Sequence, residues 1–243
     1  MSALKQTALV TGASSGIGKA IAQTLQFRGM QVYALGRNRE ALQQLQSEVG
    51  VIPLVLDITD FSQLRAGLQD LRFDVVVNNA GIMAPVGAFN SLSDESIEST
   101  IGVNVTSAIL LTRIVVTSML ENKCGHIFFT GSTAGHGSFP NMAVYAASKH
   151  AVHGFAGSLR AELAGSGVKV TEIVAGRVET NLYEPIMGKN KSKSLYKDFA
   201  PVAPQDIATM LESILDMPGH VDISRFDIVP HAQYVGGGGH RKT

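Results

Sequence analysis

The chain has 243 residues, and its 20 basic side chains balance its 20 acidic ones, so the formal net charge is zero. This balance argues against a partner recruited by bulk charge, such as nucleic acid or an anionic membrane surface. The single cysteine, Cys124, excludes an intrachain disulfide and makes a thiol-rich metal site implausible, so we expect no metal.

The N-terminal residues lack the charged region and long apolar stretch of a signal peptide, and no run reaches eighteen consecutive apolar residues. One cysteine also suits a reducing compartment. We therefore expect a cytoplasmic protein with no membrane partner.

Short apolar runs alternate with amphipathic stretches along the chain. Seven runs rich in β-branched residues predict strands buried on both faces, at 7–12, 30–36, 51–59, 73–81, 125–132, 168–176 and 225–230. Residues 16–29, 38–50 and 60–72 have helical patterns, and Gly29 and Gly50 stand where helix C-caps are expected. A last helix is expected at roughly 204–217.

Repeated strand–helix–strand units imply right-handed crossovers and a parallel sheet. We therefore predict an α/β fold in one domain, 1–243: a Rossmann-type doubly wound parallel sheet of about seven strands with helices on both faces. Pro53 agrees with this topology, because proline belongs on an edge strand and the third strand is an edge in the order 3-2-1-4-5-6. The glycines at 236–239 are expected to form a tight turn or a loose tail.

A glycine-rich turn follows the first predicted strand. Gly12, Gly16 and Gly18 have the spacing G-x-x-x-G-x-G, which lets the backbone approach a pyrophosphate. The helix that starts in this turn presents unpaired N–H groups and the positive end of its dipole. A tight turn without a ligand is the alternative, but ligands bind such sheets at the carboxyl ends of the strands, which favours dinucleotide binding.

The second strand ends in Gly36 and Arg37, where an NAD-binding chain would carry an acidic residue. Arg37 can pair with a 2′-phosphate, and no carboxylate at that position would repel it. We therefore predict NADP, with NADPH preferred over NADH. The alternative is that Arg37 or Arg39 belongs to a solvated first helical turn, and Lys19 is more typical of a surface residue.

The third and fourth strands also end in polar or small residues. Asp57 is a candidate acceptor for the adenine amino group, and Asn79, Ala80 and Gly81 are candidates to wall the adenosine ribose. Each is equally typical of turn chemistry.

Tyr145 and Lys149 are four residues apart in a predicted helix, so their side chains share one face. A neighbouring ammonium favours the phenolate, so we expect Lys149 to lower the pKa of Tyr145 and allow proton exchange at working pH. Ser132 ends the fifth strand at the same sheet edge, where its hydroxyl can donate to a carbonyl or stabilise an alkoxide.

Asn104 lies in an apolar part of the long fourth helix. Because a buried amide needs partners, we expect it to bond backbone groups at a kink, or a water leading to Lys149, or both.

The motifs in 7–180 resemble, in order and spacing, a short-chain dehydrogenase/reductase of the classical type. The matching elements are TGASSGIG, Asp57, NNAG, Asn104, Ser132, Tyr145-x-x-x-Lys149 and the AG…T element after the sixth strand. The resemblance implies an NAD(P)-dependent alcohol or carbonyl oxidoreductase with Asn104, Ser132, Tyr145 and Lys149 as the catalytic tetrad. It also implies that Lys149 bonds the nicotinamide ribose, and it implies further cofactor contacts from Ser14, Ser15, Ile17, Val178 and Thr180.

One element departs from this family pattern. Ala175-Gly176 replaces the usual Pro-Gly, which puts the local backbone path in doubt, and Arg177 follows, either reaching an acidic group on the substrate or facing solvent. Residues 181–200 interrupt the alternation and are expected to form a substrate lid, whose lysines at 189, 191, 193 and 197 attract an anion or are simply solvated.

The C-terminal part resembles the branch with NADP-dependent 3-hydroxy acid (serine, allo-threonine) dehydrogenases and sulfoacetaldehyde reductases. It suggests a small substrate, for example a 3-hydroxy acid or a related anionic hydroxy compound. The family also implies a homotetramer, or a dimer. His136, His150 and His153 lie near the cleft or are merely packed. A catalytically silent dinucleotide-binding sensor or scaffold is the alternative function.

Overall fold

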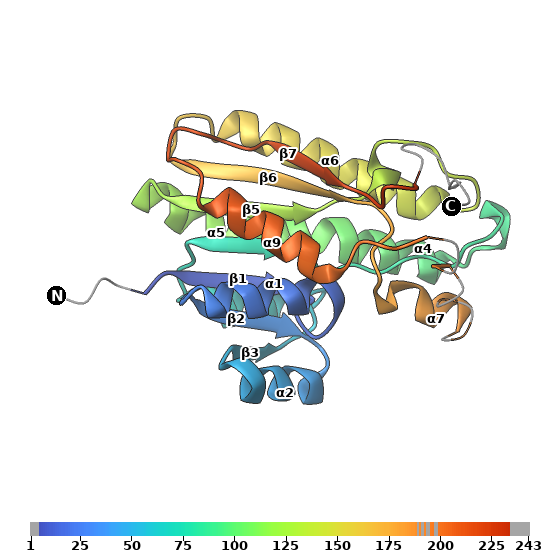
Figure 1. Cartoon of the computed structure of the whole chain (residues 1–243), viewed down its shortest axis with the longest axis horizontal. Coiled ribbons are helices and arrows are strands. Elements are labelled where there is room, and N and C mark those ends of the chain that lie inside the picture. Colours follow the sequence, from blue (N-terminus) through green and yellow to red (C-terminus); the bar gives the residue numbers. More distant parts are fainter. Residues whose placement is uncertain (1–4, 189, 191, 193–194, 197–198, 234–243) are drawn as a thin grey trace.

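The computed structural model describes residues 5–188, 190, 192, 195–196 and 199–233. Seven parallel strands form one sheet in the order β3-β2-β1-β4-β5-β6-β7 (Figure 1). Their bounds are β1 Thr7–Thr11, β2 Gln31–Gly36, β3 Ile52–Val55, β4 Val75–Asn78, β5 Gly125–Thr130, β6 Val168–Ala175 and β7 Arg225–Ile228. The predicted single-domain doubly wound fold is therefore confirmed.

Helices cover both faces of the sheet. They are α1 Gly16–Phe27, α2 Arg39–Val49, α3 Phe61–Leu68, α4 Asp94–Ile101, α5 Ser107–Asn122, α6 Ala143–Glu162, α7 Glu184–Met187 and α9 Pro204–Leu215. On one face α1 and α9 lie side by side (Figure 1) and pack with α2 into one core cluster. On the other face α3, α5 and α6 form the second cluster.

Alternation along the central strand explains the two clusters. Ala8 and Val10 of β1 point into the first, whereas Leu9 points into the second, and all three are fully buried. Because successive strand side chains face opposite sides, a central strand with helices on both faces must be apolar at every position. The continuous apolar runs of the sequence have this cause.

Pro53 lies in the edge strand β3, opposite Ala34 of β2, as its chemistry requires. The C-cap expectation holds at Gly50, whose φ of 83° lies in the left-handed region, while α1 ends at Phe27 and Gly29 follows its cap. The third and fourth strands end at Val55 and Asn78, earlier than predicted, because the next residues leave the ladder at the edge where the cleft opens.

The predicted long fourth helix is interrupted. A π-helical segment, Gly102–Thr106, separates α4 from α5 and contains Asn104. By length and composition the stretch Asp94–Asn122, counted through the π-helical segment, would be able to cross a membrane, but a buried core helix passes the same test. Here Leu111, Val115 and Met119 pack on the sheet and are at most 3% exposed.

Candidate active site

A cleft of about 870 Å³ opens at the carboxyl ends of the strands, next to α7. It brings together residues from one end of the sequence to the other. The predicted site residues that line it are Gly12, Ser14, Ser15, Gly16, Ile17, Arg37, Asp57, Asn79, Ala80, Gly81, Ser132, Tyr145, Lys149, Val178 and Thr180. Gly18 and Asn104 do not line it.

The glycine-rich turn connects β1 to α1 at one side of the cleft. Gly12 and Gly16 have φ values of 65° and 54°, in the left-handed region that favours glycine. Ser15 is the N-cap of α1, but its side chain makes no capping bond to this helix. The first-turn N–H groups of α1 are therefore left for a partner other than their own cap.

Gly18 has a packing function. A Cβ at this position would collide with the carbonyl oxygen of Gly12 and the amide nitrogen of Asn79. The close approach of α1 to the ends of β1 and β4 therefore requires glycine here, and the prediction that Gly18 contacts the cofactor gains no support from the cleft lining.

Arg37 and Asp57 meet at the outer end of the cleft. The Arg37 Nη1 and Asp57 Oδ2 atoms are 3.6 Å apart, and both side chains are substantially exposed. Asp57 Oδ1 accepts hydrogen bonds from the backbone N–H and hydroxyl of Thr59, at 2.9 and 2.7 Å. These bonds, and to a lesser extent Arg37, lower the pKa of Asp57. The prediction that no carboxylate is present to repel a 2′-phosphate considered only the end of the second strand. Asp57, which follows the neighbouring strand β3, brings a carboxylate to Arg37.

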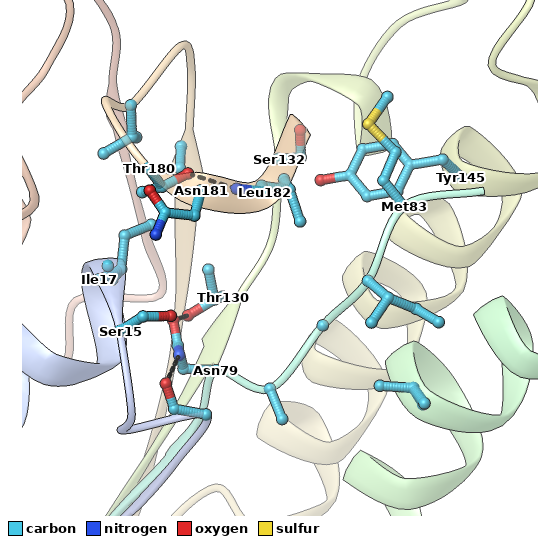
Figure 2. Close-up of a pocket in the computed structure, with 18 of the residues that line it drawn as sticks. Ser15, Ile17, Asn79, Met83, Thr130, Ser132, Tyr145, Thr180, Asn181 and Leu182 are labelled. Atoms are coloured by element: carbon cyan, nitrogen blue, oxygen red, sulfur yellow. Dashed lines mark hydrogen bonds between the residues drawn. The ribbon is translucent and has the colours of Figure 1, made fainter. Parts of the chain in front are cut away.

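Asn79 ties three strand ends together. Its Nδ2 donates to the Thr11 carbonyl at 3.0 Å, and its Oδ1 accepts from the Thr130 hydroxyl at 3.2 Å. The Thr11 hydroxyl accepts from the backbone N–H groups of Asn79 and Ala80, both at 2.9 Å. Asn79 thus has the turn chemistry left open by its sequence, and it also lines the cleft (Figure 2).

Ser132 and Tyr145 lie next to each other at the inner end of the cleft (Figure 2). Ser132 Oγ accepts from the backbone N–H of Ala134 at 3.1 Å, so it also caps the short 3₁₀ helix Thr133–Gly135. Tyr145 is 8% exposed, and burial, followed by the neighbouring Tyr183, raises its pKa well above 10. Hydrogen bonding to Ser132 opposes that rise.

Lys149 is also buried, at 5% exposure, and its Nζ lies 5.7 Å from the centre of the Tyr145 ring. Its ammonium donates to the Thr130 carbonyl at 2.7 Å. Burial lowers the pKa of Lys149 to about 8. The predicted proximity is therefore confirmed, but the predicted lowering of the Tyr145 pKa is wrong for this structure, because burial, followed by Tyr183, raises that pKa.

Asn104 supports the cleft from behind its lining. Its Oδ1 accepts from the backbone N–H of Ile82 at 2.8 Å, and its Nδ2 donates to the Ile82 carbonyl and to Ser148 Oγ, at 2.8 and 3.0 Å. Ser148 in turn donates to the Tyr145 carbonyl at 2.7 Å. Asn104 therefore bonds backbone groups at a helix irregularity, and this network joins the loop after β4 to α6.

Apolar side chains surround Tyr145, and the sequence did not reveal them as site residues. They lie in the loop after β4, in the loop before α6 and in the short helices after β6, where the sequence shows no clear periodicity, and only the expected lid at 181–200 anticipated some of them. The residues that line the cleft here are Met83, Phe139, Met142, Leu182, Tyr183 and Ile186.

Arg177 lines the cleft, but its guanidinium also has partners in the protein. It lies 5.6 Å from the centre of the Phe199 ring, and Nη1 is 3.4 Å from the Leu195 carbonyl. The unusual Ala175-Gly176 pair keeps a regular path, because Ala175 pairs with Ile228 of β7 and Gly176 N donates to the Ile228 carbonyl at 2.8 Å.

The three histidines singled out in the sequence fall outside the cleft lining. His136, His150 and His153 are not among the residues lining it. The lysines at 189, 191, 193 and 197 and the glycines at 236–239 lie outside the described residues.

Comparison with known proteins agrees with this site. The family model for short chain dehydrogenases matches residues 6–191. The uncharacterized short-chain type dehydrogenase/reductase y4eK of Sinorhizobium fredii is 45% identical, over 96% of this chain and 94% of that protein. The NADP-dependent 3-hydroxy acid dehydrogenase YdfG of Escherichia coli is 32% identical, over 96% of this chain and 99% of its own.

A solved structure gives the same result. The closed form of a serine dehydrogenase complexed with NADP⁺ superposes with a TM-score of 0.91 at 32% identity. The match covers 97% of this chain and 100% of the other. The likeness thus extends over nearly the whole of both chains.

Proposed function

Because the chain belongs to the short-chain dehydrogenase/reductase family, we propose that it is an NADP(H)-dependent oxidoreductase acting on a small alcohol or carbonyl substrate. One observation carries the proposal. The buried Tyr145 hydroxyl lies beside Ser132, with Lys149 one helical turn away, in the same cleft as the glycine-rich turn. An acid–base group and a dinucleotide cradle thus share one cavity.

The residues present fit a dinucleotide. We expect its diphosphate on the 12–18 turn, because the first N–H groups of α1 have no cap from Ser15. The adenosine would lie towards Arg37, Asp57 and 79–81, and the nicotinamide towards Tyr145, Lys149, Val178 and Thr180. When bound, the cofactor supplies or accepts the hydride.

The preference for NADPH rests on Arg37. Its guanidinium is exposed at the outer end of the cleft and can pair with a 2′-phosphate. Asp57 already neutralises part of that charge, so the phosphate would compete with a carboxylate. The name of the YdfG relative and the NADP⁺ in the serine dehydrogenase structure support the same choice.

The Tyr145 hydroxyl is neutral at working pH and would therefore be the proton donor, although its raised pKa makes it a weaker acid than a free phenol. This neutral hydroxyl would donate to the substrate oxygen during reduction, and the same oxygen would accept a proton in the reverse reaction. Ser132 would hold the substrate oxygen by a second hydrogen bond. Lys149 would hold a positive charge beside this group, and Asn104 would position the loop at 82 and α6.

Within this class we favour a 3-hydroxy acid, or a related anionic hydroxy compound, as the substrate. The YdfG relative is named for that activity. Arg177 supplies a positive charge to the cleft lining, and the apolar cluster around Tyr145 suits the carbon chain. A matched pair tests this choice: acetoacetate should be reduced with higher kcat/KM than its methyl ester. Preference for the ester would remove the anionic class and leave the oxidoreductase proposal standing.

A lid at 181–200 belongs to the same proposal. The described residues 181–183, 185 and 186 line the cleft, and Gly188 with a φ of 77° ends α7. Closure of this segment would exclude water from the buried phenol. We also propose a cytoplasmic homotetramer, with a dimer as the smaller possibility, because the family commonly assembles in this way.

The experiment that tests the function measures NADPH consumption against a panel of aldehydes, ketones and 3-oxo acids. We expect turnover with at least one member. The alternative of a silent dinucleotide-binding sensor predicts tight NADPH binding with no turnover across the panel. Failure to bind NADPH at all would contradict both functions.

A further inference from the structure

Two imidazoles and one carboxylate meet outside the cleft, close to the turn that contains Ser132. His136 follows the 3₁₀ helix Thr133–Gly135, His153 lies on α6, and Glu172 lies on β6. Their ligand atoms all lie within 4.8 Å of one another. None of the three residues lines the cleft, so cofactor and substrate contacts do not account for their convergence; Glu172 acts on the proposed chemistry only through its charge, which opposes the lowering of the Lys149 pKa.

The carboxylate is the centre of this cluster. Glu172 is 3% exposed, yet it carries a charged group into the interior. Its Oε1 lies 3.1 Å from His136 Nε2, and its Oε2 lies 2.7 Å from His153 Nδ1. Within the described part of the chain, these are the side-chain hydrogen bonds of the carboxylate. A buried carboxylate requires such compensation, and a divalent cation supplies it more strongly than two N–H donors.

We propose that His136, His153 and Glu172 form a binding site for one divalent transition-metal ion of the Zn²⁺ type. Two imidazoles and a carboxylate are a ligand set that such ions favour. With bonds of about 2.0–2.2 Å, ligand atoms around a tetrahedral ion are about 3.4 Å apart. The separations of 2.7, 3.1 and at most 4.8 Å span that value, so small side-chain movements suffice.

The fourth position would be open to water. The His153 side chain is 45% exposed, so solvent and an incoming ion reach the cluster from this side. Because a carboxylate oxygen accepts hydrogen bonds, the imidazole nitrogens that face it are assigned as N–H donors. An ion therefore requires each facing nitrogen to give up its proton, which moves to the other ring nitrogen or to solvent.

Arg225 disfavours ion binding at these three residues. Its Nη1 lies 3.5 Å from His136 Nδ1, the atom that would carry the proton when Nε2 binds an ion. Its positive charge also repels a cation. However, its Nε is paired with Asp227 Oδ1 at 2.9 Å and its side chain is half exposed, so it can move away. Arg225 therefore weakens the site without blocking it.

An ion here would act on structure. A Cβ at Gly131 would collide with Glu172 Oε1, so the carboxylate packs directly on the residue before Ser132. An ion joining the three ligands would tie α6, β6 and the turn after Ser132 together. We therefore expect it to stabilise the fold around Ser132 and to leave substrate contacts to the cleft residues.

The direct test is a titration of the full chain, without a histidine tag, with Zn²⁺ by calorimetry and with Co²⁺ by visible absorption. Cys124 is exposed, so all variants carry Cys124→Ser to remove a competing thiol ligand. We expect one ion per chain and a Co²⁺ spectrum of low coordination number. His153→Gln and Glu172→Gln should each weaken binding by at least roughly 10-fold.

His150→Gln is the matched control. It removes another histidine of α6, whose Nδ1 lies 2.9 Å from the Ala146 carbonyl and which is not part of the cluster. Its binding should equal that of the parent chain. Equal weakening by His150→Gln and His153→Gln, or no binding by the parent chain, would overturn the site. Because His153 is partly exposed, its variant keeps the test decisive if Glu172→Gln fails to fold.

Two further measurements distinguish ion binding at His136, His153 and Glu172 from ion binding elsewhere on the surface. Arg225→Gln should tighten binding several-fold, because it removes a competing donor and a repelling charge. Zn²⁺ should raise the Tm of the parent chain and not that of His153→Gln. Unchanged affinity in Arg225→Gln together with the same Tm rise in both chains would show binding elsewhere.

Discussion

The two ends of the cleft use charge in different ways. At the outer end the Arg37 and Asp57 side chains are 70% and 42% exposed, and their contact of 3.6 Å lies in solvent. At the inner end Tyr145 and Lys149 are 8% and 5% exposed. Water screens the first pair, so it costs little to rearrange when a charged ligand arrives. Burial governs the second pair, and it moves both groups towards their neutral forms.

The largest expected effect tests the inner end. Tyr145→Phe removes only the hydroxyl and should lower turnover by roughly 10²–10⁴-fold, because general acid catalysis is worth about that much. NADPH binding, followed by fluorescence, should stay nearly unchanged. Tyr33→Phe is the matched control, because Tyr33 does not line the cleft and should keep full turnover. Undiminished turnover in Tyr145→Phe would reject the proton donor.

A substitution at the outer end of the cleft should change the affinity for the cofactor and leave the turnover rate unchanged. Arg37→Ala should weaken NADPH on the order of 10-fold, because it removes a charge-assisted contact, and leave NADH almost unaffected. Arg39→Ala, at the first residue of α2, controls for the general loss of positive charge. Dissociation constants for NADPH and NADH, measured in the parent chain and in both variants, test this prediction. Equal losses for NADPH and NADH would defeat the assignment of Arg37.

A third prediction concerns the support behind the inner end. Asn104→Ala leaves the backbone N–H and carbonyl of Ile82 without their present partner. We expect it to lower the free energy of unfolding by about 1–3 kcal/mol. Urea unfolding measures this, and Asn90→Ala, at an exposed position in a short 3₁₀ helix, should change stability far less. A loss of stability no greater than that of Asn90→Ala would show that the network contributes nothing.

The smallest effect is a pH dependence from Lys149. Its pKa falls from 10.5 to about 8 on folding, so between these values the unfolded chain binds more protons than the folded one. Stability from this group therefore rises with pH above about 8, and the rise is lost as pH falls through that value.

Over one pH unit this gain is at most about 1.4 kcal/mol. Unfolding free energies at pH 8 and 9, compared between the parent chain and Lys149→Met, measure it. The parent chain should gain stability relative to the variant. A constant difference between the two chains would show that Lys149 keeps its ordinary titration.

Particular residues show how far sequence reasoning reaches. The strands, the edge position of Pro53 and the meeting of Ser132 with Tyr145 at one sheet edge were all predicted, because periodicity and topology determine them. Met83 and Phe139 of the apolar cluster were missed, because the loops that hold them carry no periodicity, whereas Leu182 falls within the predicted lid. The Arg37–Asp57 contact was missed because it joins two strands.

By itself, the sequence determined the number of strands and their order along the chain and that Tyr145 and Lys149 share a helix face, since both follow from local repeat geometry. Only the tertiary structure decided what these groups do. It set the direction of the Tyr145 pKa shift, gave Asn104 its partners at Ile82, and brought His136 and His153 onto Glu172. Burial and contacts between distant segments arise only when the helices pack on the sheet. No local sequence pattern therefore determines the direction of a buried group's pKa shift or the partners that it finds.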